Sequence, residues 1–192
     1  MSRILVFYGT TDGHTAKIAR AVAGTLETEG GTVVLADAAT AGRSVTPEYF
    51  DAVIVAASVH IGSFQRSVKR WVQSHAGVLN NRPTAFLPVC LGILEVNPLT
   101  HIELEGIVKR FLDATKWRPT HRHFVAGATP YTRYNLIKRW MIRRIVAKSG
   151  GDTDTSHDVE YTNWDDLREF VRGFSNRVTV TPHRRGPVEA RV

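Results

Sequence analysis

A short loop near the N-terminus carries residue types that suit the binding of a phosphate group. The loop, residues 8–15, reads Tyr-Gly-Thr-Thr-Asp-Gly-His-Thr and contains three threonines. Their hydroxyls can donate hydrogen bonds to an anion, and Gly9 and Gly13 let the backbone approach it closely. If a helix begins at the end of the loop, its unpaired N–H groups and the positive end of its dipole also attract an anion. The loop is therefore a candidate phosphate site that needs no basic side chain.

The spacing of the glycines separates this loop from two better-known phosphate-binding motifs. A nucleotide-hydrolase loop has four residues between its glycines and then a lysine, whereas three residues separate Gly9 from Gly13 and His14 follows. The loop also lacks the dinucleotide fingerprint Gly-x-Gly-x-x-Gly. A hydroxyl-rich loop without lysine suits one terminal phosphate that is bound and not cleaved, as in flavin mononucleotide (FMN). The alternative is an ordinary strand-to-helix turn capped by Thr or Asp.

The residues on either side of the loop predict a strand followed by a helix. Residues 4–8 form a short apolar run, which is typical of a strand buried on both faces of a parallel sheet. After the loop, Ile18, Val22 and Leu26 recur every four residues and mark the apolar stripe of a helix. The loop is thus expected between the carboxyl end of a strand and a helix N-terminus.

The rest of the chain repeats this alternation of strands and helices. Further strands are predicted at residues 32–37, 52–57, 84–91 and 123–127. Helices are predicted from Phe64 to an end near Gly77, after Pro98, and after the N-cap residue Asn163. The pattern predicts an α/β fold with a doubly wound five-stranded parallel sheet of order 2-1-3-4-5. In that order the loops at 58–63 and 89–92 reach the same crevice as the phosphate loop.

Length and composition set limits on organisation and location. The 192 residues suit one domain, which we expect over residues 1–177, followed by a mobile tail over residues 178–192. No apolar run approaches the roughly 20 residues that span a bilayer. Residue 4 already begins the first strand, which leaves no room for a signal peptide. Together with the single Cys90, this favours a cytoplasmic protein.

An insert over residues 128–160 separates the fifth strand from the last helix. It includes a predicted helix over residues 135–148 whose apolar side chains are mixed with Arg and Lys. Residues 133–148 hold six basic residues and no acidic one, and the net charge of the chain is +7. Such a segment can cover a ligand, dock a partner or lie on an anionic membrane, or it can simply pack on the core with its charges outward. We expect no nucleic acid partner, because no reader motif accompanies the charge.

With these residues assembled, the chain resembles the flavodoxin-like proteins and, among them, the menaquinone-dependent protoporphyrinogen oxidases. The resemblance rests on the phosphate loop at 10–15, on residues 57–62 and above all on residues 117–164. The last stretch includes Trp117-Arg118-Pro119, the run 149–155 and Tyr161-Thr162-Asn163-Trp164. The first motif is typical of flavodoxin-like proteins in general, and the long stretch is more specific. Residues from 178 onward have no counterpart.

The resemblance implies FMN as the cofactor and assigns residues to its two ends. The residues around its phosphate would be Thr10, Thr11, Asp12, Gly13, His14 and Thr15. Those flanking its isoalloxazine ring would be Ser58, Val59, His60, Ile61 and Gly62 from one loop and Val89, Cys90, Leu91 and Gly92 from another. His60 is a candidate proton relay or else a packing residue. We expect no metal site, although His121 and His123 share one face of a strand.

The resemblance also implies oxidation of protoporphyrinogen to protoporphyrin in haem synthesis, with electrons passed to a membrane quinone. Guanidinium groups match the propionates of the porphyrinogen, and aromatic rings suit its macrocycle. The residues in question are Arg133, Arg139, Arg143, Tyr131, Tyr134 and Trp140. The basic insert would then contact the cytoplasmic face of the membrane peripherally. The alternatives are a flavodoxin-type electron carrier and another FMN-dependent quinone reductase.

Overall fold

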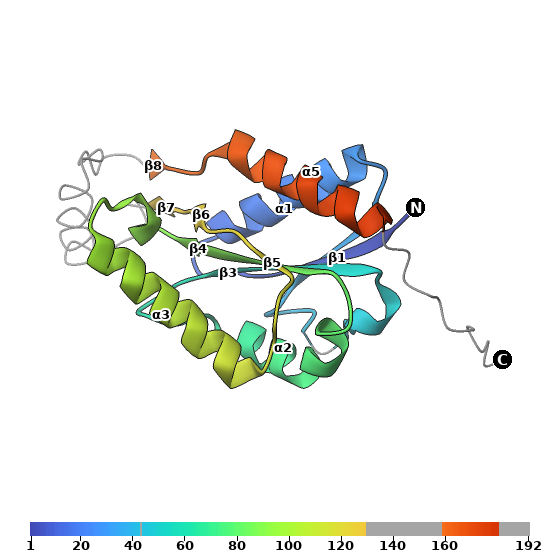
Figure 1. Cartoon of the computed structure of the whole chain (residues 1–192), viewed down its shortest axis with the longest axis horizontal. Helices are drawn as coiled ribbons and strands as arrows, with labels where there is room; N and C mark the ends of the chain where they lie inside the picture. Colours follow the sequence, from blue (N-terminus) through green and yellow to red (C-terminus); the bar gives the residue numbers. More distant parts are fainter. Residues whose placement is uncertain (43, 130–158, 181–192) are drawn as a thin grey trace.

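A twisted parallel sheet runs through the middle of the molecule, with helices on both of its faces (Figure 1). This computed structural model describes residues 1–42, 44–129 and 159–180. The strands of the sheet are β1 (Arg3–Gly9), β2 (Thr32–Asp37), β3 (Ala52–Ser58), β4 (Thr84–Cys90), β5 (His121–Arg122) and β6 (Val125–Ala126). Their order is β2-β1-β3-β4-β5, with β6 also paired to β4, and all of these pairs are parallel. The predicted α/β fold and its strand order 2-1-3-4-5 are confirmed.

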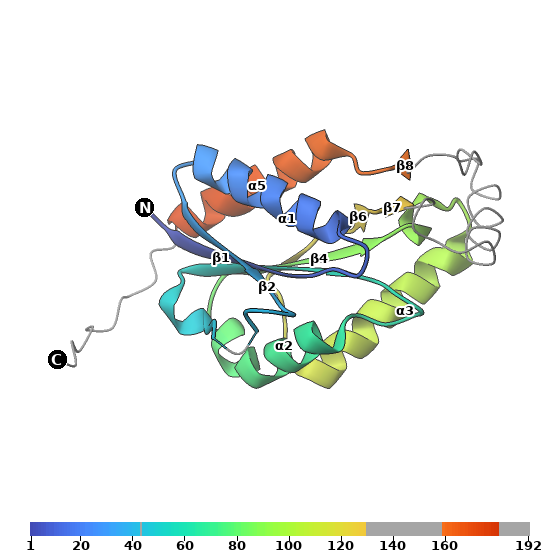
Figure 2. The same ribbon diagram turned by 180° about the vertical axis from the view of Figure 1, so that it is seen from behind.

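Two pairs of helices cover the two faces of the sheet. The helices are α1 (His14–Thr28), α2 (Arg66–Leu79), α3 (Pro98–Thr115) and α5 (Trp164–Val180), with short 3-10 turns η1 (Pro47–Tyr49) and η2 (Gly92–Leu94). Figure 2 shows α1 beside α5 on one face, and α2 and α3 on the other. Because alternate residues of a strand point to opposite faces, Ile4 and Val6 pack beneath α1 and α5, while Leu5 and Phe7 pack against α2 and α3.

The fifth strand of the sheet is divided, whereas the sequence predicted one strand over residues 123–127. Two short pieces, β5 and β6, pair with β4 on either side of residues 123–124. The pairing starts earlier than predicted because the Thr120 hydroxyl donates to the Thr84 carbonyl at 2.6 Å and fixes the chain at the start of β4. The His123 N–H still donates to the Phe86 carbonyl at 3.0 Å, so the two pieces follow one line.

The predicted end of the second helix near Gly77 is wrong. Helix α2 continues through Gly77 to Leu79, and the Asn80 N–H donates to the Ala76 carbonyl at 2.9 Å. Leu79 is fully buried, so core packing of the last turn outweighs the low helix propensity of the glycine.

The last helix also extends beyond its predicted end. Helix α5 continues to Val180, and Val178, the first residue of the expected tail, is buried in the core that α5 and α1 form with the sheet. Its predicted N-cap is confirmed, because the Asn163 side chain accepts from the Asp166 N–H at 3.2 Å. Residues 181–192 of the expected mobile tail lie outside the described residues.

The two ends of the 128–160 insert lie side by side. Strand β7 (Ala128–Thr129) pairs antiparallel with β8 (Val159–Glu160), so that Ala128 faces Glu160 and Thr129 faces Val159. The predicted helix over residues 135–148, with its basic residues, lies outside the described residues. Of the helices that the structure describes, none combines the length and apolar character needed to cross a membrane.

Replacement of Leu79 by Ala tests whether the last turn of α2 is anchored in the core. We expect the free energy of unfolding to fall by about 2–5 kcal/mol, as for other buried leucines, in a denaturant titration followed by circular dichroism. The neighbouring Val78, which is only half-buried, provides the control, and Val78→Ala should cost less. A loss of under about 1 kcal/mol in Leu79→Ala would contradict the packing described for this turn.

Candidate functional site

Three loops meet at the edge of the sheet where the strands end. Gly9 of β1 lies opposite Ala57, Ser58 of β3 opposite Val89, and Cys90 of β4 opposite Ala126. The segments 10–15, 58–63 and 89–92 therefore lie at the same edge of the sheet, as predicted; Val89 and Cys90 are the last residues of β4. The strand order reverses between β1 and β3, which is where open α/β sheets bind their ligands.

The N-terminus of α1 is suited to hold an anion. Gly13 precedes the helix with a φ of +94°, a conformation that other residues rarely adopt. The Gly13 N–H donates to the Thr10 hydroxyl at 2.9 Å, and the first backbone bond of the helix is from the Lys17 N–H to the Gly13 carbonyl at 3.3 Å. Gly13 is the N-cap residue and has no side chain with which to cap the helix. The N–H groups of its first residues, 14–16, thus have no partner within the helix and can bind a ligand.

Gln65, which the sequence reasoning did not single out, connects two of the loops. Its side-chain amide nitrogen donates to the hydroxyls of Thr11 at 3.1 Å and Ser58 at 2.5 Å. Its amide oxygen is buried and has no hydrogen-bond partner among the described residues. A Cβ at Gly9 would approach this oxygen to 3.1 Å and the Val68 side chain to 2.4 Å, so glycine is required there. The sequence did contain a signal for this role, because Gln65 is a polar residue that closely follows the loop at 58–63.

The loop at 58–63 turns tightly and presents an apolar side chain. His60 and Ser63 exchange backbone hydrogen bonds of 2.8 and 3.2 Å around Ile61 and Gly62, which both have positive φ. A positive φ is uncommon for a branched residue such as Ile61 and is often found at functional sites. The Ile61 side chain is 91% exposed and can contact a flat ring. His60 is half-buried, and its role as a proton relay stays a prediction.

The end of β4 offers its backbone to the crevice. The side chains of Val89 and Cys90 are buried. Burial raises the pKa of the Cys90 thiol to about 11, so the thiol is protonated at neutral pH and is not a nucleophile. Leu91 and Gly92 follow, and a Cβ at Gly92 would lie 3.2 Å from Thr100 of α3. The loop is therefore held close to α3.

The side chain of His14 faces the returning end of the insert. Its Nε2 lies 2.7 Å from the Thr162 hydroxyl, which in turn donates to the Ala126 carbonyl at 2.7 Å. Because that hydroxyl uses its proton on Ala126, Nε2 of His14 must be the donor. Burial, the largest effect, lowers the pKa of His14, with Lys17 acting in the same direction and Glu160 against it. His14 can thus offer a phosphate its backbone N–H, while its ring contacts Thr162.

Glu160 forms the second contact between the insert and α1. Its carboxylate accepts from the Lys17 ammonium at 2.6 Å and from the Trp164 indole N–H at 2.7 Å, and it lies 3.7 Å from Nδ1 of His14. Burial alone would raise the pKa of Glu160, but the hydrogen bonds from Lys17 and Trp164 outweigh it and lower this pKa. Glu160 is therefore ionised at neutral pH.

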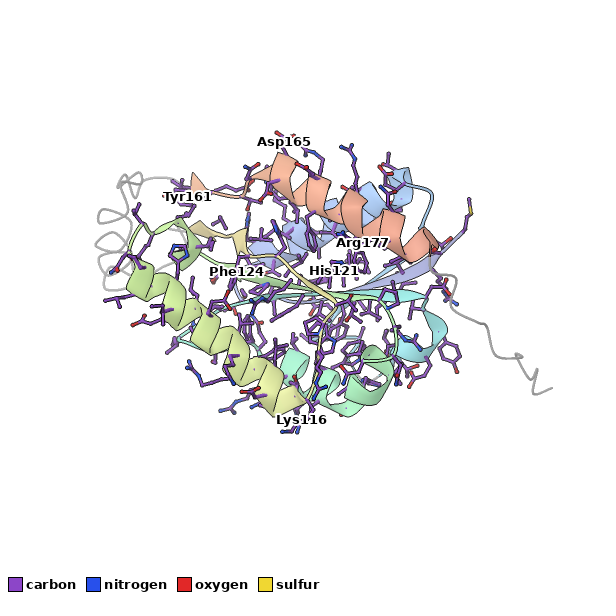
Figure 3. All side chains as sticks on the ribbon, viewed as in Figure 1. Lys116, His121, Phe124, Tyr161, Asp165 and Arg177 are labelled. Carbon is purple, nitrogen blue, oxygen red and sulfur yellow. The ribbon has the colours of Figure 1, made fainter. Side chains whose placement is uncertain are left out.

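Several residues singled out from the sequence lie elsewhere. Trp117 is buried at the opposite edge of the sheet, where its indole N–H donates to the Thr84 hydroxyl at 3.3 Å. His121 and His123 both lie against α5, with ring centroids 5.7 Å from Phe174 and 4.6 Å from Phe170. In Figure 3, His121 lies beneath α5, whereas Tyr161 lies at the end of the molecule where β7 and β8 are found. The predicted substrate residues Tyr131, Arg133, Tyr134, Arg139, Trp140 and Arg143 lie outside the described residues.

Cavity size does not locate this site. Clefts of about 450 and 520 Å³ occur beside Trp117 and beside Trp71, and none of the residues lining either cleft belongs to the three loops. The assignment of the site depends instead on the strand ends and on the N-terminus of α1, where Gly13 is the N-cap residue.

The lowered pKa of His14 predicts a loss of stability in mild acid. The unfolded chain takes up its proton near pH 6.5, before the folded chain does, so stability present above that pH is lost as the pH falls toward the lower folded pKa. His14→Gln keeps a donor for Thr162 but cannot titrate, and we expect its free energy of unfolding to fall less than that of the wild type between pH 7.5 and 5.5. Equal losses in wild type and His14→Gln would contradict the burial of a neutral imidazole.

Comparisons with known proteins identify the family. Residues 5–156 match the family model described as the flavodoxin domain. The chain is 34% identical over 172 residues to protoporphyrinogen IX dehydrogenase (quinone) of Escherichia coli K12, with 88% of this chain and 93% of that one covered. It is 31% identical over 184 residues to the Leishmania major protein of the same name, with 95% and 78% covered.

Solved structures agree on the fold. An archaeal flavodoxin has a TM-score of 0.53 at 10% identity, with 92% of this chain and 99% of that one covered. A short-chain flavodoxin associated with a bacterial microcompartment has a TM-score of 0.56 at 14% identity, with 93% and 99% covered. The chain therefore belongs to the flavodoxin domain family and, within it, to the family of the quinone-dependent protoporphyrinogen IX dehydrogenases.

Proposed function

We propose that this protein is an FMN-dependent oxidoreductase that oxidises protoporphyrinogen IX to protoporphyrin IX in haem biosynthesis and passes the electrons to a quinone. The observation that carries the proposal is the 34% identity to a protein of that activity over 88% of this chain, a span longer than the flavodoxin domain match. We further propose menaquinone as the acceptor and peripheral contact of the protein with the cytoplasmic face of the membrane.

The N-terminus of α1 fits the phosphate of FMN. The cofactor phosphate would accept hydrogen bonds from the N–H groups at the start of α1 and from the hydroxyls of Thr10, Thr11 and Thr15. Asp12, Gly13 and His14 would complete the turn around it. The side chain of Thr15 is buried. Its hydroxyl is a candidate ligand of the phosphate because Thr15 lies in the first turn of α1. When bound, FMN supplies the electron-accepting chemistry that no side chain of the site offers.

The other two loops suit the ring of the flavin. The turn at Ile61 and Gly62 presents an exposed apolar side chain, and Ser58, Val59 and His60 lead into it. From β4 the protein would contribute the backbone of residues 89–92. The side-chain amide of Gln65 holds two of these loops together through the hydroxyls of Thr11 and Ser58. Fixed polar groups of this kind orient the ring and tune its electronics.

The insert enters and leaves beside these loops. The Gly127 N–H donates to the Cys90 carbonyl at 3.3 Å, and the Tyr161 N–H donates to the Gly127 carbonyl at 3.1 Å. The residue before the insert is thus hydrogen-bonded to the last residue of β4, and the residue after the insert is hydrogen-bonded to Gly127. This position supports a role of Arg133, Arg139 and Arg143 in holding the porphyrinogen propionates and of Tyr131, Tyr134 and Trp140 in contacting its macrocycle.

Two related functions would use the same loops. A flavodoxin-type electron carrier and another FMN-dependent quinone reductase both need the cofactor site, and neither needs to bind porphyrinogen. The charge excess of residues 133–148 favours an anionic substrate or surface over the basic partners of a typical acidic carrier.

An assay of porphyrin fluorescence tests the proposal directly. Purified protein loaded with FMN should convert protoporphyrinogen IX to fluorescent protoporphyrin IX faster than the spontaneous rate, and a menaquinone analogue should sustain the reaction without oxygen. Omission of FMN is the control. A chain that binds FMN but shows no flavin-dependent turnover would contradict the proposed activity and favour the electron carrier.

The same assay addresses the basic residues of the insert. A triple variant with Arg133, Arg139 and Arg143 replaced by Gln should still bind FMN but raise the KM for porphyrinogen roughly tenfold or more, because charged hydrogen bonds are lost. The matched control replaces Arg110, Lys116 and Arg118, which are exposed at or near the end of α3, and loses the same charge. Equal effects of both triples would mean that net charge, and not the position of the arginines, matters.

A further inference from the structure

Two segments far apart in the sequence meet at the first turn of α1. His14 contacts Thr162, which lies 148 residues further along the chain, and Lys17 contacts Glu160, which lies 143 residues further. We call these four residues the α1–β8 contact. One side of the contact belongs to the turn proposed to hold the phosphate, and the other side is the returning end of the insert. The contact joins the cofactor turn to Glu160, the last residue of the insert, and to Thr162 just after it.

The Thr162 hydroxyl occupies a central position in this contact. It accepts from Nε2 of His14 at 2.7 Å and donates to the Ala126 carbonyl at 2.7 Å. Ala126 is paired with Cys90, the last residue of β4. One hydroxyl therefore connects the phosphate turn, the end of β6 and the chain that follows β8. Both of its hydrogen bonds are satisfied, as a buried polar network requires.

The two halves of the contact differ in their exposure to solvent. Thr162 is only 9% exposed, whereas the Lys17 side chain is 57% exposed. Water and salt screen the Lys17–Glu160 pair, so that pair contributes little by itself. Water cannot replace the lost hydrogen bonds of a buried hydroxyl in the same way, so their loss costs more free energy. We therefore expect Thr162 to matter more than Glu160.

We propose that Thr162 is a positioning residue that couples occupancy of the phosphate-binding turn to the position of the insert's returning end. The proposal rests on the proposed function only in that the turn takes the phosphate of FMN. Thermodynamic linkage makes the coupling reciprocal. FMN at the turn should stabilise residues 159–163, and loss of the Thr162 hydroxyl should weaken FMN binding even though Thr162 is not assigned to the cofactor.

Substitutions at Thr162 test this coupling through the dissociation constant of FMN, measured by quenching of flavin fluorescence. Thr162→Val keeps the shape but removes the hydroxyl, and we expect it to raise the dissociation constant roughly fivefold, as for loss of a buried hydrogen bond. Thr162→Ser keeps the hydroxyl and should stay within about twofold of wild type. The matched control is Thr115→Val in α3, a buried threonine whose hydroxyl bonds to the Phe111 carbonyl at 2.9 Å and which should bind FMN like the wild type.

Hydrogen exchange measures the same coupling from the other side. In wild type and Thr162→Ser, addition of FMN should slow exchange of the backbone amides at residues 159–163, and in Thr162→Val this protection should be largely lost. Without FMN, Thr162→Val should speed exchange of the Lys17 N–H, which belongs to the first turn of α1. A general loss of stability would speed exchange in Thr115→Val as well, so that control separates local from global opening.

The outcomes distinguish this proposal from the proposed function. FMN affinity of Thr162→Val within twofold of wild type, or Thr162→Ser as weak as Thr162→Val, overturns the coupling. If the wild type does not bind FMN, the proposed function fails, and unchanged exchange at Lys17 in Thr162→Val without FMN would then overturn the coupling as well. A protein that binds FMN, shows the coupling and lacks porphyrinogen oxidation contradicts the proposed function alone.

Discussion

The N–H groups at the start of α1, which have no partner within the helix, are the constraint on which the rest of the site depends. A helix N-terminus needs partners for these groups, and the N-cap residue Gly13 has no side chain to supply one. The Thr10 hydroxyl is instead used by Gly13, which holds the turn open toward the crevice. Two contacts keep this geometry. Gln65, just before α2, donates to Thr11 of the turn, and Thr162, just after β8, contacts His14. We propose that an anion bound at this point accepts hydrogen bonds from these N–H groups.

Much of this arrangement could be predicted from the sequence, because it follows from local patterns. Short apolar runs between turns specify buried parallel strands, and parallel strands bring their carboxyl-end loops to one edge. The contact of His14 with Thr162 could not be predicted, since periodicity does not say which distant polar residues meet. The role of Gln65 was missed for the same reason. The helix end at Gly77 was predicted wrongly because burial of Leu79 outweighs local propensity.

The fold alone does not decide the reaction. Flavodoxins that share it are only 10–14% identical to this chain, whereas the quinone-dependent protoporphyrinogen IX dehydrogenases share 31–34% over most of the chain. The insert over residues 128–160 follows Gly127, which is hydrogen-bonded to Cys90 of β4, and ends at Glu160, which is bonded to Lys17 in the first turn of α1. Substrate choice is therefore best sought in this insert, whose two ends lie beside the residues proposed to hold the cofactor.

A comparison of FMN with riboflavin tests the central claim most directly, because the two flavins differ only in the terminal phosphate. Titration of the protein with each flavin, followed by fluorescence, gives two dissociation constants. If the N-terminus of α1 binds the phosphate, FMN should bind at least about tenfold more tightly than riboflavin, and the difference should shrink as inorganic phosphate is added. Equal affinities for the two flavins would contradict the assignment of this turn as the phosphate site.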